Sequence, residues 1–144
     1  MQNPKVQISL VDKTLPMPKY ETSGSVGFDL YAREETIIKP KEIALIPSNI
    51  ICKVPDGYML AVVSRSSTPR KKGLLKPHAI GVIDQDYCGQ TDEILLQVYN
   101  FTDQDIVISK LDRIAQGIFL PVLKANFVEF NPQEQNRGGF GSTG

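Results

Sequence analysis

Residues 78–90 read HAIGVIDQDYCGQ. In this stretch a short apolar run, 79–83, leads to a polar tip that begins with Asp84 and is followed by Tyr87. An apolar run of this length before Gly-bearing turn residues predicts a strand that enters a β-turn. Backbone groups at such a tip lack a complete strand ladder, so they need other hydrogen-bonding partners. Two interpretations stay open here: a plain hairpin of ordinary turn residues, or a pocket where a planar ligand meets a carboxylate and an aromatic ring.

Length and charge limit what the chain can do. At 144 residues it is expected to form one domain with a sizeable core. The 16 Lys and Arg residues balance the 16 Asp and Glu residues, so no overall field attracts nucleic acid or an acidic membrane. No apolar run of about 18 residues and no charged-then-apolar leader is present, so neither a transmembrane span nor a signal peptide is expected. An anion should therefore bind only at a local cluster.

The cysteines and the histidine restrict the metal chemistry. Cys52 and Cys88 are too few for a disulfide framework, and there is no Cys-x-x-Cys pair. Free thiols in a reducing cytosol are the expectation. With His78 as the one histidine, a zinc site of nitrogen and sulfur ligands alone is not available. A metal ion, if one binds, should be a hard cation held by oxygen ligands.

Short β-rich segments fill most of the chain, because ten prolines and eleven glycines divide it into short pieces. Many short strands separated by turn signals such as Pro-Asp-Gly (55–57) predict an all-β barrel or jelly roll. A helix is expected only around 67–73, where Pro69 limits it to a single turn. The predicted strands are 6–10, 28–31, 42–46, 50–54, 58–63, 93–99, 106–108, 114–120 and 122–130.

The last residues, 131–144, differ from the rest. They have no hydrophobic periodicity and contain four glycines, so they should be mobile when nothing is bound. By composition alone, a disordered tail is the simpler interpretation. The other is a phosphate and base clamp, because glycine N–H groups and Arg137 can bind phosphate and Phe140 can cap a base.

Two further clusters carry isolated polar groups. Residues 25–30 place Asp29 inside an apolar strand, where a carboxylate is either a paired structural acid or an anchor for a cation. Residues 113–116 place Gln116 among apolar neighbours, where its amide must bond either to backbone or to a ligand.

A hydroxyl-rich cluster, 64–68, follows the predicted strand 58–63 and precedes a basic loop, 70–72. Hydroxyls and backbone N–H groups beside an arginine can form a phosphate nest. The same residues fit an N-cap for one helical turn equally well.

In their order along the chain, these clusters resemble the five motifs of the trimeric dUTPases, the dUTP pyrophosphatases. Gly-Phe-Asp-Leu-Tyr-Ala (27–32) resembles the first motif, and Arg-Ser-Ser (65–67) resembles the second. Gly-Val-Ile-Asp-Gln-Asp-Tyr-Cys-Gly (81–89) resembles the third, and Arg-Ile-Ala-Gln (113–116) the fourth. Arg-Gly-Gly-Phe-Gly-Ser-Thr-Gly (137–144) is similar to the fifth. Each motif alone is weak to moderate, but five in order cover nearly the whole chain and favour the pocket over the plain hairpin.

The resemblance implies a distorted jelly-roll barrel over residues 1–130 and a mobile arm, 131–144, that closes over an active site. It implies a homotrimer whose shared sites take the third motif from one subunit, the first, second and fourth from a neighbour, and the tail from the third. The implied activity is Mg²⁺-assisted hydrolysis of dUTP to dUMP and pyrophosphate, which limits uracil incorporation into DNA and supplies dUMP for dTMP synthesis. The implied location is the cytoplasm, or the host-cell interior if the chain is viral, with neither nucleic acid nor membrane as a partner.

The resemblance also implies roles for the site residues. Asp84 would be the base that activates water for in-line attack on the α-phosphorus. Asp29 would contact Mg²⁺ through water, and Gln116 would bond the nucleotide near its α-phosphate. In the tail, Phe140 would stack on uracil. The other residues that the resemblance implies to contact the substrate are Arg65, Ser66, Ser67, Arg137, Gly139, Gly141, Ser142 and Thr143.

The nucleoside is expected to lie on the hairpin. Uracil would pair with backbone groups of 78–83, where the implied contacts are Ile80, Gly81, Val82 and Ile83, and this pairing rejects cytosine. The ring of Tyr87 would pack on the deoxyribose and clash with a ribose 2′-hydroxyl. His78 is either a surface histidine or a water-mediated uracil contact.

Some positions depart from the family pattern. Cys88 stands where many members carry arginine after the tyrosine, and Ser64 stands where proline is frequent. Residues 91–93 lengthen the loop that follows the third motif.

Two rival functions are weighed. The dCTP deaminases share the fold and the Arg-Ser-Ser motif, but their catalytic glutamate falls at Gln97, whose amide cannot shuttle the proton. A non-catalytic β-barrel that kept a nucleotide pocket is the second rival, and Asp84 together with the complete tail argues against it. Ammonia release from dCTP and pyrophosphate release from dUTP separate the three.

Overall fold

The computed structural model describes residues 4–133 and 135–141, and within them the chain is almost entirely β-structure. The one helical segment is η1, a turn of π-helix over Thr68–Lys72. The strands are β1 Gln7–Leu10, β2 Phe28–Tyr31, β3 Thr36–Ile38, β4 Ile43–Pro47, β5 Ile50–Lys53, β6 Tyr58–Ser64, β7 Leu74–Leu75, β8 Gly81–Ile83, β9 Leu95–Asn100, β10 Ile106–Ile108 and β11 Arg113–Pro121.

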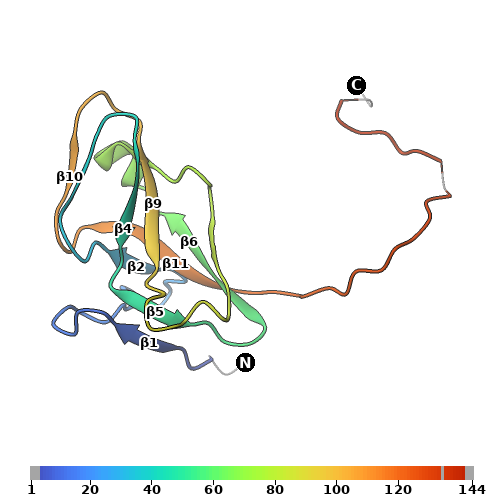
Figure 1. Cartoon of the computed structure of the whole chain (residues 1–144), viewed down its shortest axis with the longest axis horizontal. Helices are drawn as coiled ribbons and strands as arrows, with labels where there is room; N and C mark the ends of the chain where they lie inside the picture. The colour runs from blue at the N-terminus through green and yellow to red at the C-terminus, as the bar shows by residue number, and fades with distance from the viewer. Residues whose placement is uncertain (1–3, 134, 142–144) are drawn as a thin grey trace.

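Antiparallel pairing joins these strands into four small sheets that wrap around one core (Figure 1). The largest sheet has the order β2-β11-β6-β8, and a second has the order β4-β9-β7. Two strand pairs, β1 with β5 and β3 with β10, complete the body. Neighbours in the sheets are distant in sequence, as in a jelly roll, and the architecture is a distorted jelly-roll barrel. This confirms the fold class expected from the sequence.

The core follows from alternation along the strands. In β9 the side chains of Leu96, Val98 and Asn100 are buried while the residues between them are more exposed. Leu30, Ile46 and other apolar side chains from every large strand meet them inside the barrel. Period-two burial of this kind fixes the pairing register, because a slip of one residue would turn the core face to solvent.

Asn100 is a polar residue in this core, and its hydrogen bonds are complete. Its side-chain amide donates to the carbonyls of Ile38, Lys39 and Gln104 at 2.7–3.1 Å. Its Oδ1 accepts from the backbone N–H and the hydroxyl of Thr102. A buried amide satisfied on every side holds the turn after β9 in place.

The helical turn lies where the sequence predicted it. Pro69 stands in its first turn, and Gly73 ends it with a left-handed backbone conformation (φ 68°). The Gly73 N–H donates to the carbonyl of Pro69, which closes the turn. A glycine in this conformation stops a helix at little steric cost.

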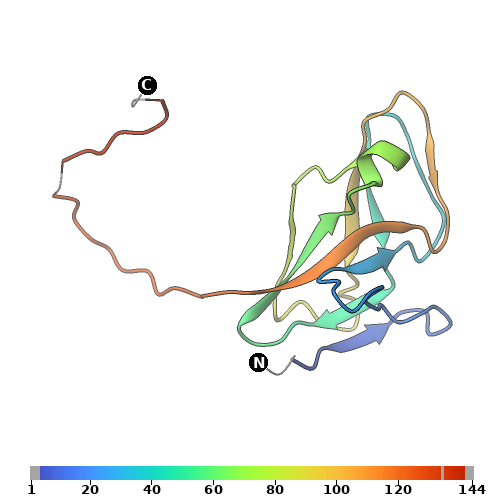
Figure 2. The same cartoon turned by 180° about the vertical axis from the view of Figure 1, so that it is seen from behind.

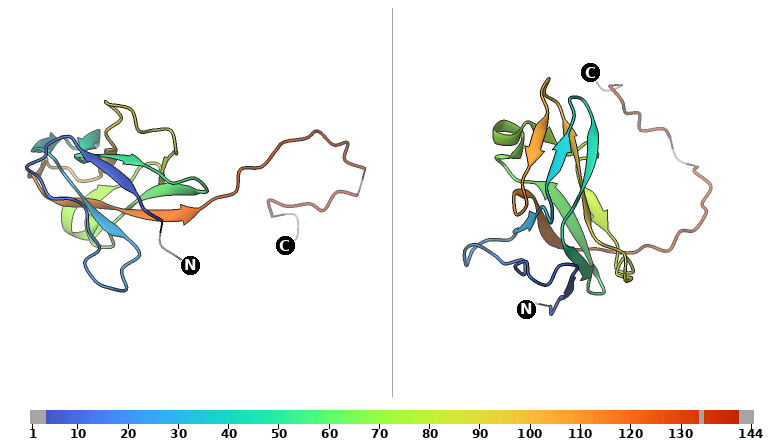
Figure 3. Two further views of the ribbon diagram at one scale, coloured as in Figure 1. Left: turned by 90° about the horizontal axis from the view of Figure 1, so that it is seen from below. Right: turned by 60° about the vertical axis from the view of Figure 1, so that its left-hand side comes forward.

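The predicted strand over 122–130 is wrong. After β11 the chain leaves the barrel and runs outward as an extended arm, as Figures 1, 2 and 3 show from different sides. Its large apolar side chains are almost fully exposed: Leu123, Phe127, Val128 and Phe130. The β-branched and aromatic composition that predicted a strand is present, but no neighbouring strand of the same chain pairs with this arm within the described residues.

Two short strands, β3 with three residues and β7 with two, were not expected. The strand predicted from 79 also begins later, at Gly81. Residues 77–80 form a turn, in which Ala79 has a left-handed backbone conformation (φ 58°) and the Ile80 N–H donates to the carbonyl of His78. A non-glycine residue in this conformation cannot continue a strand.

Candidate active site

A polar cluster lies on one face of the four-stranded sheet. In the register of β11, Gln116 stands opposite Asp29 of β2 and Val63 of β6. Arg113 and Gln116 are three residues apart, so a regular strand would point their side chains to opposite faces. Between Arg113 and Ala115, β11 has one residue more than β2 opposite it, and this irregularity brings Arg113 to the face of Gln116.

Asp29 is the centre of this cluster. It is buried, and each of its carboxylate oxygens has its own arginine. Arg65 Nε lies 2.7 Å from Oδ1, and Arg113 Nη1 lies 3.2 Å from Oδ2. A guanidinium group has five N–H donors, so both arginines keep donors for another anion. In this chain Asp29 is therefore a paired acid that orients two arginines.

A pocket of about 300 Å³ opens over the cluster. Guanidinium, hydroxyl and amide groups on its wall are the groups that bind phosphate oxygens. The residues that line it are Glu21, Ser25, Gly27, Asp29, Arg65, Ser66, Arg113 and Gln116.

Gln116 is fixed in this pocket from two sides. Its Nε2 donates to the carbonyl of Ser64 at 3.1 Å, at the end of β6. Its Oε1 lies where a side chain at Gly27 would stand, 2.7 Å from the position of a Cβ built there. The amide thus bonds to backbone, one of the two outcomes expected for a glutamine at this position.

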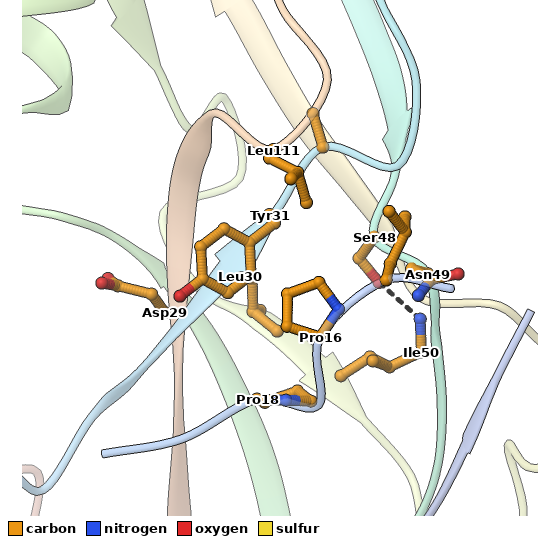
Figure 4. Close-up of a pocket in the computed structure, with 11 residues that line it drawn as sticks. Pro16, Pro18, Asp29, Leu30, Tyr31, Ser48, Asn49, Ile50 and Leu111 are labelled. Carbon is orange, nitrogen blue, oxygen red and sulfur yellow. Dashed lines mark hydrogen bonds between the residues drawn. The ribbon is translucent and has the colours of Figure 1, made fainter. Parts of the chain in front are cut away.

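A second cavity, of about 10 Å³, lies beneath the 15–18 loop and is walled by Pro16, Leu30 and Ser48 (Figure 4). Its volume is about that of one water molecule. The Asp29 carboxylate points away from this cavity (Figure 4). It pairs with Arg65 and Arg113 instead. This cavity is a packing gap behind the site.

The hairpin that carries Asp84 is a separate region. In the described residues β8 pairs only with β6, so its other edge is open and presents backbone groups to a ligand. Asp84 follows β8 directly and is exposed. Tyr87, also exposed, donates its hydroxyl to the carbonyl of Glu93 at 3.2 Å.

Within one chain, the structure does not bring these two regions together. Ile83, the last residue of β8, pairs with Leu60. Leu60 lies four residues before Ser64 at the far end of β6, which corresponds to about 13 Å along the strand. The Asp29 cluster unites Arg65, Ser66 and Gln116. The strand β8 pairs with the middle of β6 and runs away from this cluster, so Asp84 and Tyr87, which follow β8, lie farther from it than Gly81 does.

Gly81 and His78 lie close together beside the open edge. A Cβ built on Gly81 would come within 3.3 Å of both His78 Nε2 and the Val62 side chain, so this position is tightly packed. Ile80 and Val82 are exposed on the same segment. Burial, with a smaller effect of the positive charge of Lys76, lowers the pKa of His78 below its ordinary value.

Ser67 occupies the N-cap position of η1 but makes no side-chain cap hydrogen bond. Its carbonyl accepts from the Lys71 N–H at 2.8 Å instead. The hydroxyl of Ser66 is exposed at the rim of the pocket. The phosphate-nest interpretation is therefore compatible with the geometry, while side-chain capping by Ser67 is absent.

Of the predicted tail residues, the structure describes Arg137, Gly139, Phe140 and Gly141. Arg137 and Phe140 are exposed, and Phe140 has a left-handed backbone conformation (φ 51°) next to Gly141 (φ 88°). Ser142 and Thr143 lie outside the described residues.

Four pocket residues, Glu21, Ser25, Gly27 and Arg113, were absent from the predicted set. Ser25 stood only within the quoted cluster 25–30 and was given no role. Arg113 was quoted within a motif, but its side chain reaches the site only through the irregularity in β11, which no spacing rule reveals. Gly27 lies two residues before Asp29 and so shares its face, a signal that strand periodicity does provide. Glu21 comes from an irregular loop and had no signal in the sequence.

Among residues 4–133 and 135–141, no three His, Cys, Asp or Glu side chains gather in a way that could hold a metal ion. Over the same residues, no helix has the length and apolar character needed to cross a membrane.

Solved structures share this fold. The dUTPase from Streptococcus mutans superposes with a TM-score of 0.77 at 36% identity, covering 83% of this chain and 98% of that chain. The Staphylococcus bacteriophage 80alpha dUTPase with dUPNHPP superposes with a TM-score of 0.84 at 23% identity, covering 99% of both chains. The architecture is thus one that nucleotide hydrolases share.

Sequence comparison gives the family. The model of the dUTPase family matches residues 13–144. A deoxyuridine 5′-triphosphate nucleotidohydrolase of Lactococcus lactis subsp. lactis is 43% identical over 131 residues, covering 89% of this chain and 87% of the relative. One from Helicobacter pylori (strain J99) is 37% identical over 143 residues, covering 97% of both. The chain belongs to the dUTPase family.

Proposed function

We propose that this dUTPase hydrolyses dUTP to dUMP and pyrophosphate with Asp84 as the general base. The observation that carries the proposal is the pocket in which Arg65 and Arg113 converge on Asp29, beside Ser66 and Gln116. Paired guanidinium groups with a hydroxyl and an amide suit a polyphosphate. Removal of dUTP limits uracil incorporation into DNA, and the dUMP formed feeds dTMP synthesis.

The open edge of β8 receives the uracil. The open edge of β8 leaves backbone groups of Gly81, Val82 and Ile83 free to pair with a planar base, and a side chain at Gly81 would be crowded by His78 and Val62. Ile80 and His78 border the same edge. A base with the wrong donor and acceptor pattern would leave backbone groups unpaired, which gives strong discrimination. Tyr87, held through its hydroxyl by Glu93, packs on the deoxyribose.

Asp84 acts at the sugar end of the triphosphate. Its carboxylate takes a proton from a water molecule as that water attacks the α-phosphorus in line, and the bond to the pyrophosphate oxygen breaks. Gln116 orients the α-phosphate. Arg65, Ser66 and Ser67 offset the charge that builds up on the leaving pyrophosphate.

The residues fit Mg²⁺ that arrives with the substrate. Magnesium keeps several waters and binds one or two carboxylates plus substrate phosphates, so it does not need a group of three acidic side chains. Asp29 faces the pocket, and its oxygens can each accept a further hydrogen bond from a metal-bound water. When bound, Mg²⁺ neutralises phosphate charge. A structural Mg(II) ion is described for a dUTPase from phage phi11 of S. aureus.

The site is shared within a homotrimer. One chain separates Asp84 from the Asp29 cluster, so a complete site requires Asp84 of one subunit next to Arg65 of another. The exposed arm supports association, because side chains such as Phe127, with 96% of its surface exposed, are normally covered by a partner. The third motif comes from one subunit, the first, second and fourth from a neighbour, and the tail from the third.

The tail, 131–144, is a mobile lid over the site. Phe140 stacks on uracil, and the backbone of Gly139 and Gly141, together with Arg137, Ser142 and Thr143, binds the β- and γ-phosphates. Closure excludes water and orders the triphosphate. Deletion of 137–144 is expected to reduce turnover strongly while the unfolding temperature stays unchanged.

Two free cysteines, Cys52 and Cys88, suit a reducing compartment, and we place the enzyme in the cytosol, or inside the host cell if it is viral.

A product assay with Mg²⁺ across dUTP, dCTP, dTTP and UTP tests the function. Pyrophosphate should form from dUTP alone, and ammonia from dCTP would contradict the proposal. Asp84→Asn should retain dUTP binding and lose turnover by about 10²–10⁴-fold, the usual contribution of a general base. Wild-type turnover in this variant would remove Asp84 from the mechanism.

A further inference from the structure

The edge strand β8 ends one residue before Asp84, although β6 continues beside it. The two strands pair Gly81 with Val62, Val82 with Ala61 and Ile83 with Leu60. The same register, extended, would place Asp84 opposite Met59 and Gln85 opposite Tyr58. The chain instead turns at residues 85–86, so the backbone ladder does not reach Tyr58.

The side chain of Gln85 takes the place of the missing ladder. Its Nε2 donates to the carbonyl of Tyr58 at 3.0 Å, where the backbone N–H of a continued strand would stand. This bond is partly buried, whereas Asp84 beside it is exposed. The hydrogen bond of Gln85 therefore joins the turn, directly after Asp84, to Tyr58, the first residue of β6.

The other end of the same amide joins the root of the arm. Gln85 Oε1 accepts from Lys124 Nζ at 3.1 Å. The root itself is held near β6, because the Val122 N–H donates to the carbonyl of Gly57 at 2.8 Å. One side chain thus connects the turn, the start of β6 and the segment that follows β11.

Little else holds Asp84. Its carbonyl accepts from the Tyr87 N–H at 3.4 Å, a long hydrogen bond. Across residues 4–133 and 135–141, no side-chain hydrogen bond or ion pair holds its carboxylate. The direction of this carboxylate therefore depends on where the turn is fixed, and Gln85 is the adjacent residue that fixes it.

We propose that Gln85 is a positioning residue for Asp84: its bond to the Tyr58 carbonyl sets where β8 ends and so aims the base at the attacking water. The inference rests on the proposed role of Asp84. Gln85 itself does not contact the substrate. Its contribution should appear in the rate of the chemical step rather than in substrate binding, because a small misplacement of a catalytic group is costly to rate.

The test compares Gln85→Met with Gln7→Met in the full-length, Mg²⁺-loaded enzyme. Methionine keeps the length of the side chain and removes both hydrogen bonds. We expect kcat for dUTP to fall about 10- to 100-fold, with KM changed by less than about twofold. The thermal unfolding temperature of Gln85→Met should stay within a few degrees of the wild-type value. The control Gln7→Met, which changes an exposed residue of β1, should behave in about the same way. Unchanged kcat in Gln85→Met would overturn the inference.

Gln85→Glu tells the two bonds apart. A carboxylate still accepts from Lys124 but cannot donate to the Tyr58 carbonyl, so kcat should fall as in Gln85→Met. Wild-type kcat in Gln85→Glu would show that the Tyr58 bond is not what positions the base.

A double mutant separates this inference from the proposed function. If Gln85 acts through Asp84, Gln85→Met should cause no further loss in the Asp84→Asn background. An equal loss in both backgrounds would overturn the positioning role while leaving Asp84 as the base. Full turnover in Asp84→Asn alone would overturn the proposed function, and the role of Gln85 with it.

Discussion

Gly27 directly precedes β2, two residues before Asp29, and the space left by its missing side chain is used by Gln116. A Cβ at this position would stand 2.7 Å from Gln116 Oε1 and 3.3 Å from Gln116 Cδ. The end of a glutamine side chain can move, so Gly27→Ala should displace the amide and weaken its bond to the Ser64 carbonyl. We infer that the glycine at position 27 maintains the shape of the pocket and contributes little to the stability of the fold.

For Gly27→Ala we expect turnover of dUTP to fall at least about tenfold, because an oriented phosphate contact is lost. The free energy of unfolding should change by less than about 1 kcal/mol. Steady-state kinetics and urea unfolding measure the two quantities. The matched control is Gly24→Ala, since a Cβ at Gly24 meets no atom within 4 Å. A large loss of stability without loss of turnover would contradict this account.

Cys52 is a buried thiol in the core, and Cys88 is half-buried in the loop after Tyr87. Burial, with a smaller effect of Cys88, raises the pKa of Cys52 from 9.0 to about 11. The folded protein therefore holds this proton more tightly than the unfolded chain does. The resulting stability is present below pH 9 and is lost as the pH rises toward 11.

Substitution of Cys52 by alanine should remove this part of the pH dependence. Between pH 9 and pH 11, the free energy of unfolding measured in urea should fall more steeply with pH for the wild type than for Cys52→Ala. At pH 8, a thiol reagent should label Cys88 in the folded protein and Cys52 only after unfolding, because the thiolate is the reactive form. Rapid labelling of both thiols in the folded protein would contradict the burial argument.

At the scale of elements, Glu93 joins three segments. Its carboxylate accepts from Arg33 Nε and Nη2 at 2.8 and 3.1 Å. Its Oε1 also accepts from the Asn49 N–H at 2.7 Å, in the turn between β4 and β5 where Asn49 has a left-handed conformation (φ 72°). The carbonyl of Glu93 accepts a hydrogen bond from the Tyr87 hydroxyl, so the same residue supports the hairpin that carries Asp84.

Glu93→Ala should lower the free energy of unfolding by about 1–3 kcal/mol, because a half-buried arginine and a backbone N–H lose their partner. The control is Glu34→Ala, which removes an exposed carboxylate 3.3 Å from the same arginine. That change should cost less than about 0.5 kcal/mol, as for other surface ion pairs. Equal costs in urea unfolding would show that the Asn49 bond and the burial of Glu93 do not matter.

The sequence predicted the large strands well and the links between them poorly. Strands such as β6 and β9 are long enough to show alternation, so their positions followed from periodicity. Strands β3 and β7 exist only through their partners β10 and β9, which local sequence does not reveal. The arm over 122–130 had the composition of a strand but has no pairing partner among the described residues of its own chain. Pairing decides whether such a segment becomes a strand.

The site residues, like the strands, divide into those that the sequence predicted and those that it did not. Asp29, Arg65 and Gln116 stood out because each is a polar residue in or next to an apolar strand, and the structure unites them. Arg113 needed the irregularity in β11, and the hydrogen bonds of Gln85 needed the register between β6 and β8. Both depend on non-local pairing, which spacing along one strand does not encode.

For the whole molecule, the separation of Asp84 from Arg65 leads to a test that single variants do not provide. If each site combines Asp84 of one subunit with Arg65 of a neighbour, then Asp84→Asn and Arg65→Gln each inactivate every site of their own trimer. Glutamine at 65 can still donate to Asp29, so the variant should fold. In mixed trimers, some sites would receive the intact residue from each variant.

Co-refolding the two variants in equal amounts should therefore restore activity. With random assortment, about one quarter of the sites in a cyclic trimer would pair an intact Asp84 with an intact Arg65. The specific activity of the mixture should approach about one quarter of that of the wild type, while each variant refolded alone stays inactive. A mixture as inactive as its components, although mass spectrometry shows mixed trimers, would mean that each site is built from one chain. The distance between β8 and the Asp29 cluster would then have to close by rearrangement of the barrel, which its packed core opposes.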